Sequence, residues 1–325
     1  MSPGRRRPAF TLVVIIANIS IMIIATACAT VPDRKDLALE WYGVGNAWLA
    51  VQKWAEAGKA FDRAISLDPS LVAASYNAAR ALVEAGSYDR AIGVADELLA
   101  RSPGNVRYLS IKAYALWKSG QAQKATETYE LAYAQDHFAA DVVYNSSVLL
   151  LDSGKPAEAA DRLAPLLLSR PDDPELLGLD ARALAAADRM PEAIAAWETL
   201  KATGRMDGGN WELLAGLYIK SGSYAKALEA LAECVKAEPK RATAWFAAAK
   251  VRLTLADDGK GGLEALSKAL EAGFADKEQA AALISEAHLL ERVAVVKALA
   301  AKGLVEVAGD RPGASDMYPG GKGAL

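Results

Sequence analysis

The chain has 325 residues, of which 52% are hydrophobic, and a formal net charge of −3. A nearly neutral chain gives no electrostatic basis for binding nucleic acid, which depends on concentrated positive charge. Cys28 and Cys234 are its two cysteines, so the sequence contains no disulfide framework.

Residues 1–27 have the pattern of a secretory signal peptide. Arg5, Arg6 and Arg7 form a basic start, and an apolar stretch runs from Thr11 to Ala25. The segment Ala25-Thr26-Ala27-Cys28 resembles the lipobox of bacterial lipoproteins, although Ala25 stands where that motif usually has leucine. The resemblance implies that Cys28 is lipidated and becomes the mature N-terminus. The alternative is an uncleaved membrane anchor, because the apolar run is nearly long enough to span a bilayer.

Both interpretations place the folded part outside the cytoplasm and tether it to a membrane. Ala29 is not the aspartate that typically retains lipoproteins in the inner membrane. The resemblance therefore implies a lipid anchor in the outer membrane of the bacterial envelope, with the folded part facing the periplasm. Residues 28–37 are expected to form a short tether.

A period of 34 residues runs through the rest of the chain. It relates four prolines, Pro69, Pro103, Pro171 and Pro239, and four glycines, Gly86, Gly120, Gly154 and Gly222. Repetition at this period predicts a stack of helical hairpins, in which no repeat buries its own apolar face. The repeats are expected to start near residues 38, 72, 106, 140, 174, 208 and 242.

The first repeat shows the residue pattern most clearly. It carries Trp41, Val44, Gly45, Trp48, Ala57, Phe61, Ala64 and Pro69. These stand where the tetratricopeptide repeat (TPR) family prefers Trp, Leu, Gly, Tyr, Ala, Phe, Ala and Pro, so residues 38–275 resemble that family. The resemblance implies an all-α superhelical solenoid of about seven hairpins. Small residues at positions 8, 20 and 27 let paired helices approach closely, and large ones at 4, 11 and 24 fill the space between hairpins.

The C-terminal end departs from the pattern. Gly259, Gly261 and Gly262 interrupt the seventh repeat, whose second helix is expected over residues 263–272. Residues 276–303 are expected to form a capping helix region, because a terminal repeat must cover the last apolar face. Residues 304–325 lack apolar periodicity, which predicts a disordered tail.

No motif for catalysis, cofactor binding or metal binding is found in the sequence. His137 and His288 lie in different repeats, without a partner at metal-ligand spacing. Cys234 occupies the small buried position 27, which favours a packing role. We therefore expect no enzyme activity, no cofactor and no metal. An enzyme would require turnover that depends on a single buried carboxylate or histidine.

The TPR resemblance implies that the first helix of each hairpin lines a concave face, with positions 2, 5, 6, 9, 12 and 13 pointing inward. The candidate binding residues at these positions are Tyr42, Asn46, Tyr76, Asn77, Arg80, Arg107, Tyr114, Trp117, Tyr144, Asn145 and Arg182. Asparagine can donate to and accept from a peptide backbone, and tyrosine offers a large contact area with a polar tip. The pattern resembles the asparagine ladder of some peptide-binding arrays, although Ile111 breaks it. The alternative is that these aromatic residues only pack on neighbouring helices.

A TPR clamp for a C-terminal carboxylate uses Lys and Asn in the first repeat, Asn in the second, and Lys and Arg in the third. Asn46, Asn77 and Arg107 match three of these positions. Tyr42 and Ile111 replace two cations, which should weaken capture of a carboxylate, so we reject this clamp.

The sequence therefore predicts a non-enzymatic scaffold or adaptor lipoprotein that binds protein or peptide partners in the cell envelope. Pilus, secretin and outer-membrane assembly are the settings in which TPR lipoproteins share this layout. The alternative is an accessory component of a solute transporter, with a small-molecule ligand held around Tyr114, Trp117 and Tyr144.

Overall fold

The computed structural model describes residues 33–306. The expected signal peptide, the expected lipidation site Cys28 and residues 307–325 of the expected tail lie outside the described residues. The expected start of the disordered tail at residue 304 is wrong, because Leu304 is buried and its N–H donates to the Leu299 carbonyl at 3.1 Å. Residues 33–306 form sixteen helices and no strand, and the chain divides into two compact units between Pro171 and Asp172. The predicted all-α architecture of about seven hairpins with a C-terminal capping helix region is confirmed.

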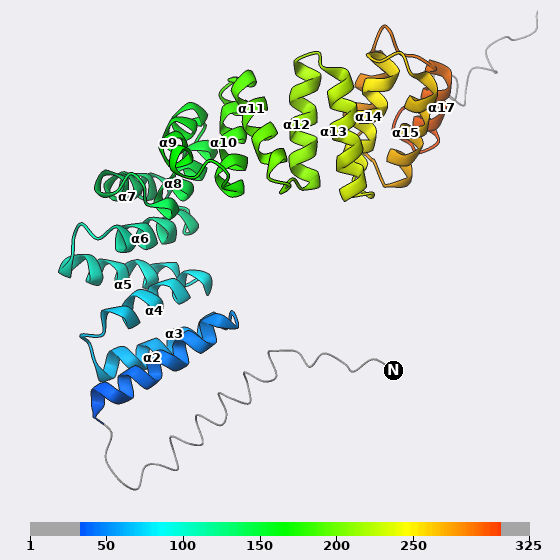
Figure 1. Ribbon diagram of the computed structural model, residues 1–325. Helices are drawn as coiled ribbons and strands as arrows, with labels where there is room; N and C mark the ends of the chain where they lie inside the picture. The colour runs from blue at the N-terminus through cyan, green and yellow to red at the C-terminus, as the bar shows by residue number, and fades with distance from the viewer. Residues whose placement is uncertain (1–32, 307–325) are drawn as a thin grey trace, which may run out of the picture. The chain divides into compact units, whose positions relative to one another are not determined.

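The first unit contains four hairpins (Figure 1). Its helices are α2 (Arg34–Ala50), α3 (Trp54–Leu67), α4 (Val72–Glu84), α5 (Tyr88–Arg101), α6 (Val106–Lys118), α7 (Ala122–Gln135), α8 (Ala140–Asp152) and α9 (Pro156–Ser169). We call the first helix of each hairpin the A helix and the second the B helix. Residues 34–37, expected in the tether, instead form the first turn of α2, because the Asp33 side chain caps that helix by accepting from the Lys35 N–H.

The second unit contains three hairpins and two further helices (Figure 1). Its helices are α10 (Pro174–Ala186), α11 (Met190–Ala202), α12 (Gly208–Lys220), α13 (Tyr224–Ala237), α14 (Ala242–Thr254), α15 (Gly259–Glu271), α16 (Lys277–Ser285) and α17 (Arg292–Ala300). None of the helices α2–α17 combines the length and the apolar character needed to cross a membrane.

The periodic glycines end A helices. Gly86, Gly120, Gly154 and Gly222 have φ between 73° and 83°, the left-handed conformation that glycine adopts without steric cost. After Gly86, the Ser87 N–H bonds back to the Leu82 carbonyl at 2.8 Å, which closes the last turn of α4. Gln52 and Asp188 hold the same repeat position with φ of 58° and 59°. The left-handed turn that ends an A helix therefore also forms where this repeat position is not glycine.

Small buried residues hold each hairpin together. In the first hairpin Gly45, Ala57 and Ala64 are buried, and the fully buried ring of Phe61 lies against Gly45. The close approach replaces hydrated apolar surface with dense packing between the helices.

The interruption expected in the seventh repeat is wrong, because α15 begins at Gly259, four residues earlier than expected. Asp258 caps this helix by accepting from the Gly261 N–H at 2.9 Å. A Cβ atom on Gly262 would lie 2.4 Å from Cγ of Leu253, so glycine here permits close contact between α14 and α15. The glycines are part of the helix and of its packing.

The cap closes the end of the second unit. Leu283 of α16 and Val295 and Leu299 of α17 are fully buried, and the Leu290 N–H donates to the Leu253 carbonyl at 3.0 Å. The rings of Phe246 and Phe274 stack 3.9 Å apart. These contacts cover the apolar face of the last hairpin.

Candidate functional site

The A helices of the first unit form a continuous row. Cα atoms of α2 and α4, of α4 and α6, and of α6 and α8 approach within 8 Å, so each A helix contacts the next. Side chains on this row can therefore act together across repeats, as the repeat positions predict.

Three polar side chains join α2 to α4. Asn77 Nδ2 donates to Asn46 Oδ1 at 2.8 Å and to the Tyr42 hydroxyl oxygen at 3.3 Å. Both amide hydrogens of Asn77 are thereby used. Among residues 33–306 no donor reaches Asn77 Oδ1 and no acceptor reaches the Asn46 amide nitrogen. The cluster keeps one free acceptor, Asn77 Oδ1, and the free amide N–H groups of Asn46.

A hollow of about 670 Å³ opens beside this cluster. It is lined by Tyr42, Val72, Ala73, Tyr76, Asn77, Arg80, Asn105, Val106, Arg107 and Tyr108. We call it the α4–α6 hollow, since most of its wall comes from α4 and from the start of α6. Five of the predicted residues line it, and Asn46 supports it through Asn77.

The α4–α6 hollow is positively charged. Arg80 and Arg107 are exposed at its wall, and none of its lining residues is acidic. Within the described part of the chain, no carboxylate oxygen lies within 4.0 Å of either guanidinium. An acidic ligand would therefore meet two guanidinium groups that have no internal ion pair to give up.

Tyr76 forms the aromatic part of the wall. Burial raises the pKa of its phenol, an effect that the positive charge of Arg80 partly offsets. The phenol is therefore protonated at neutral pH and can donate a hydrogen bond. Its ring centroid lies 6.0 Å from that of Tyr108, a tilted arrangement that is favourable for aromatic pairs.

Tyr114 and Trp117 lie elsewhere. Their rings pack edge to face, with centroids 6.0 Å apart, against the buried cluster around Leu109 and Tyr129. The Lys118 ammonium covers both rings, at 5.3 and 5.2 Å from their centroids. These contacts fit the alternative in which the two aromatic side chains pack on neighbouring helices.

The remaining candidates do not line the α4–α6 hollow. Tyr144 and Asn145 are half-buried on α8. Arg182 is exposed on α10, in the second unit, and its guanidinium donates to the Gly178 carbonyl at 3.2 Å.

Asn105 and Tyr108 were missed by the repeat-position rule. Asn105 caps α6 by accepting from the N–H groups of Arg107 and Tyr108, at 3.0 and 3.3 Å. Both residues stand at a helix start, outside the inward positions considered. The sequence signal that could have indicated Asn105 is its N-cap residue type directly before an A helix.

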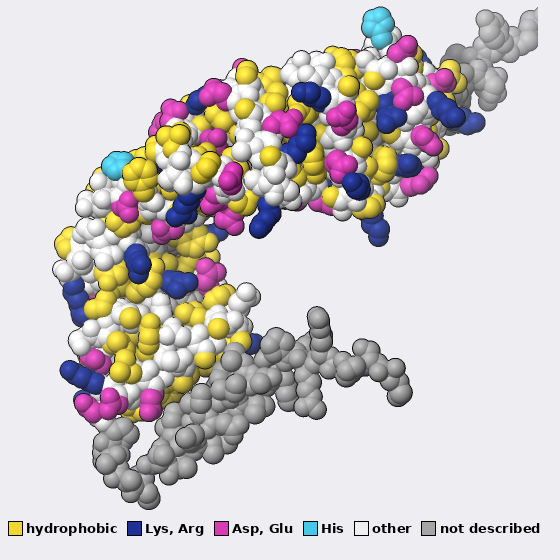
Figure 2. All heavy atoms as spheres, in the orientation of Figure 1, with side chains coloured by type: hydrophobic (Ala, Val, Ile, Leu, Met, Phe, Trp, Pro, Cys, Tyr) yellow, Lys and Arg dark blue, Asp and Glu magenta, His cyan; other side chains and the backbone are white. Residues whose placement is uncertain are grey.

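The described residues offer no candidate metal site. Residues 33–306 contain no group of three His, Cys, Asp or Glu side chains that could hold a metal ion. His137 and His288 are both exposed. On the face drawn in Figure 2, Lys and Arg side chains are interspersed with Asp and Glu.

Sequence comparison decides the family. Two profiles described as tetratricopeptide repeat match residues 49–114, 116–182 and 209–251, which together are more than half of the chain. The chain belongs to the TPR family. The TPR fold indicates a scaffold for protein–protein interaction, and TPR proteins are generally non-enzymatic.

Solved TPR structures share the fold. A TPR protein from Parabacteroides merdae is 15% identical, with a TM-score of 0.53 over 80% of this chain and 99% of its own. Pseudomonas aeruginosa pilF is 17% identical, with a TM-score of 0.54 over 64% of this chain and 95% of its own. YrrB, described as a TPR protein with an unusual peptide-binding site, is 18% identical, with a TM-score of 0.51 over 57% and 96%. At these identities the likeness shows the fold alone. No curated protein matches the chain in sequence.

Proposed function

We propose that this TPR protein is a lipid-anchored adaptor of the cell envelope that binds an extended peptide segment of a protein partner in the α4–α6 hollow. The observation that carries the proposal is the Asn46–Asn77 pair, which keeps a free acceptor and a free donor beside two unpaired guanidinium groups. The backbone of an extended peptide offers the matching donor and acceptor.

The charge of the hollow specifies the peptide further. Arg80 and Arg107 favour a segment that carries an acidic side chain, because guanidinium groups bind carboxylates through paired hydrogen bonds. This arrangement differs from the rejected carboxylate clamp, in which Tyr42 and Ile111 stand at cationic positions. The hollow has two guanidinium groups: Arg107 stands at a clamp position, and Arg80 supplies the second from a position that the clamp does not use. Peptide binding by YrrB is consistent with a peptide site on this fold.

The N-terminal sequence supports the location. A signal peptide followed by Cys28 favours lipidation, and Ala29 favours the outer membrane. Only Ala29–Pro32 separate Cys28 from Asp33, the cap of α2, so the first hairpin would be held near the membrane surface. Partners within reach are then envelope proteins that are assembled at that membrane.

Site-specific photo-crosslinking in intact cells tests the peptide site. A photoreactive residue replaces Ala73, which lines the hollow, or Lys59, an exposed residue of α3 that does not. The proposal expects partners captured from position 73 to be lost in an Arg80→Glu/Arg107→Glu variant and retained in an Arg182→Glu variant. Equal capture in both variants would exclude the hollow as the docking site.

Mass spectrometry of the mature N-terminus tests the anchor separately. The proposal expects a diacylglyceryl-modified Cys28. In a Cys28→Ser variant from which the signal peptide has been removed, it expects release of the protein from membranes. An unmodified peptide that continues through Cys28 would exclude the lipid anchor and leave the peptide site untouched.

A further inference from the structure

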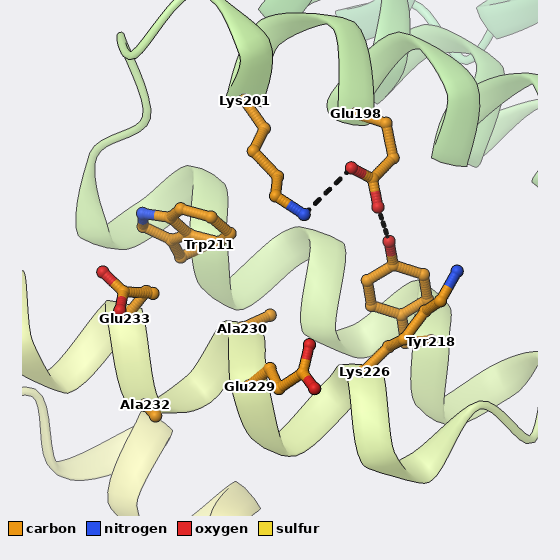
Figure 3. A pocket seen from close by; sticks show the side chains of 9 residues that line it. All are labelled: Glu198, Lys201, Trp211, Tyr218, Lys226, Glu229, Ala230, Ala232 and Glu233. Carbon is orange, nitrogen blue, oxygen red and sulfur yellow. Dashed lines mark hydrogen bonds and ion pairs between the residues drawn. The ribbon is translucent and has the colours of Figure 1, made fainter.

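A second hollow lies in the second unit, on the side of the B helices (Figure 3). It has a volume of about 510 Å³, and α12 forms its floor between α11 and α13. It is lined by Glu198, Lys201, Trp211, Tyr218, Lys226, Glu229, Ala230, Ala232 and Glu233. We call it the α11–α13 hollow.

One edge of this hollow is fixed by a chain of polar contacts. Lys201 Nζ lies 3.0 Å from Glu198 Oε2, and the Tyr218 hydroxyl donates to Glu198 Oε1. The hydrogen bond from Tyr218 is the main reason that the pKa of Glu198 is lowered, so this carboxylate is ionised. Both Glu198 oxygens are used internally, and Lys201 is neutralised by its partner.

The opposite edge carries carboxylates that are available to a ligand. Glu229 and Glu233 are exposed and lie one turn apart on α13. In Figure 3 Glu229 borders the space between Trp211 and Tyr218, and Glu233 lies beside Trp211 on the side away from Tyr218. Among the described residues no cationic nitrogen lies within 4.0 Å of Glu229. Glu233 pairs only with Lys236, whose side chain is 75% exposed and therefore easily displaced.

The first unit contains the corresponding hollow three repeats earlier, between α5 and α7. It has a volume of about 540 Å³ and is lined by Asp89, Ile92, Asp96, Lys112, Leu116, Gln121, Lys124, Glu127 and Thr128. Three charges recur at the same repeat positions in both hollows, as Asp96 and Glu198, Lys124 and Lys226, and Glu127 and Glu229. These recurring charges make the α5–α7 hollow an internal reference.

The two hollows differ at their floor and at one edge. Leu109 and Leu116 of the first unit correspond to Trp211 and Tyr218 of the second, and Leu131 corresponds to Glu233. The α11–α13 hollow therefore has two aromatic rings and Glu233 at repeat positions where the first unit has leucine. Of these leucines Leu116 lines the α5–α7 hollow, which also carries Asp89 and Lys112. Aromatic faces beside carboxylates attract cations, and the chain's own ammonium groups already lie at them: Lys201 Nζ is 6.0 Å from the Trp211 centroid and Lys226 Nζ is 5.5 Å from that of Tyr218.

We propose that the α11–α13 hollow binds an arginine side chain of a protein partner, with its guanidinium stacked on Trp211 and hydrogen-bonded to Glu229 and Glu233. Arginine fits better than lysine because its planar guanidinium both stacks on an indole and reaches two carboxylates at once. An acidic group would face the carboxylates of Glu229 and Glu233. This site is independent of the peptide site in the first unit, since it involves a different unit and the opposite charge.

Fluorine NMR of the full chain, with its seven tryptophans replaced by 5-fluorotryptophan, tests this site. The Trp211 signal is assigned as the one absent from a Trp211→Leu variant, or from Trp211→Phe if that variant does not fold. The probe is a capped Gly-Arg-Gly peptide, and its control carries citrulline, the neutral analogue of arginine. We expect the arginine peptide to shift the Trp211 signal saturably and the citrulline peptide to leave it unchanged.

Charge-neutralising variants complete the test. Glu229→Gln should weaken the arginine peptide about two- to fivefold, the range of one exposed charge interaction, whereas the matched Glu127→Gln in the α5–α7 hollow should have no effect. The proposal is overturned if citrulline produces the same shift, if the two variants behave alike, or if the Trp211 signal does not respond. A Trp211 shift that depends on protein concentration alone would assign the hollow to a second copy of the chain and would also overturn it.

Discussion

Gly45 is the residue at which a single methyl group should most clearly disturb both the fold and the candidate site. A Cβ atom at this position would lie 2.3 Å from Cε1 and 2.6 Å from Cδ1 of Phe61. Carbon atoms in contact are about 3.5–4.0 Å apart, so α2 or the ring would have to move by about 1 Å. Phe61 is fully buried and packs against Tyr42, with ring centroids 5.9 Å apart, which leaves the ring little room.

The size of the effect follows from two opposing terms. Overpacking a well-packed core costs about 1–3 kcal/mol, whereas alanine is favoured over glycine within a helix by about 1 kcal/mol. We expect Gly45→Ala to lower the free energy of unfolding of the α2–α3 hairpin by up to about 2 kcal/mol. Asn46 is the next residue, so a shift of α2 should also lengthen its hydrogen bond to Asn77 and weaken peptide binding.

Gly43 supplies the matched control on the same helix. It is exposed, and a Cβ atom there would have no neighbour within 4 Å, so Gly43→Ala should stabilise α2 by up to about 1 kcal/mol. Amide hydrogen exchange followed by mass spectrometry measures the opening free energy of α2 and α3 in the full chain. Equal or greater protection in Gly45→Ala than in the unsubstituted protein would refute the steric argument.

Three further predictions concern single side chains. Asn77→Ala removes the hydrogen bonds to Asn46 and Tyr42 and should cost about 1 kcal/mol in urea unfolding, together with loss of photo-crosslinking from position 73; unchanged crosslinking would contradict the role of Asn77. Burial raises the pKa of Asp180 to about 6, and because the folded state then binds the proton more tightly than the unfolded state, stability should fall as pH rises from about 4 to about 6. Asp180→Asn should therefore stabilise the protein at pH 7 but not below pH 4, as judged by urea midpoints, and an equal gain at both pH values would argue against titration of Asp180. Burial also raises the pKa of the Cys234 thiol to about 11, and Sγ donates to the Gly208 carbonyl at 3.1 Å. A thiol reagent should label Cys234 only on the timescale of unfolding, so rapid labelling of the native protein would contradict this burial.

The repeat pattern was sufficient to predict the fold class. A 34-residue spacing of glycine and proline requires helices that end at regular intervals, and small residues at fixed positions require those helices to pair. The low helix propensity of Gly259, Gly261 and Gly262 predicts an interruption, yet α15 begins at Gly259. Contact with Leu253 requires glycine at position 262, and the Asp258 cap starts the helix, so packing outweighed propensity.

The candidate site was predicted only in part, for a related reason. Repeat positions indicate which face of a helix a side chain occupies, and on that basis Tyr42, Tyr76, Asn77, Arg80 and Arg107 were placed on one surface, where they line the α4–α6 hollow. The same rule selected Tyr114 and Trp117, whose rings pack on the core, and it missed Asn105 and Tyr108.

The sequence by itself determined that the chain is a stack of helical hairpins, because helix ends and close helix pairing depend on residue type at short range. Tertiary structure alone decided where space is left between the hairpins, which charges in that space are unpaired, and that the chain divides at Pro171. The physical reason is that a hollow is the space that side chains from three different helices fail to fill. No single repeat contains that information.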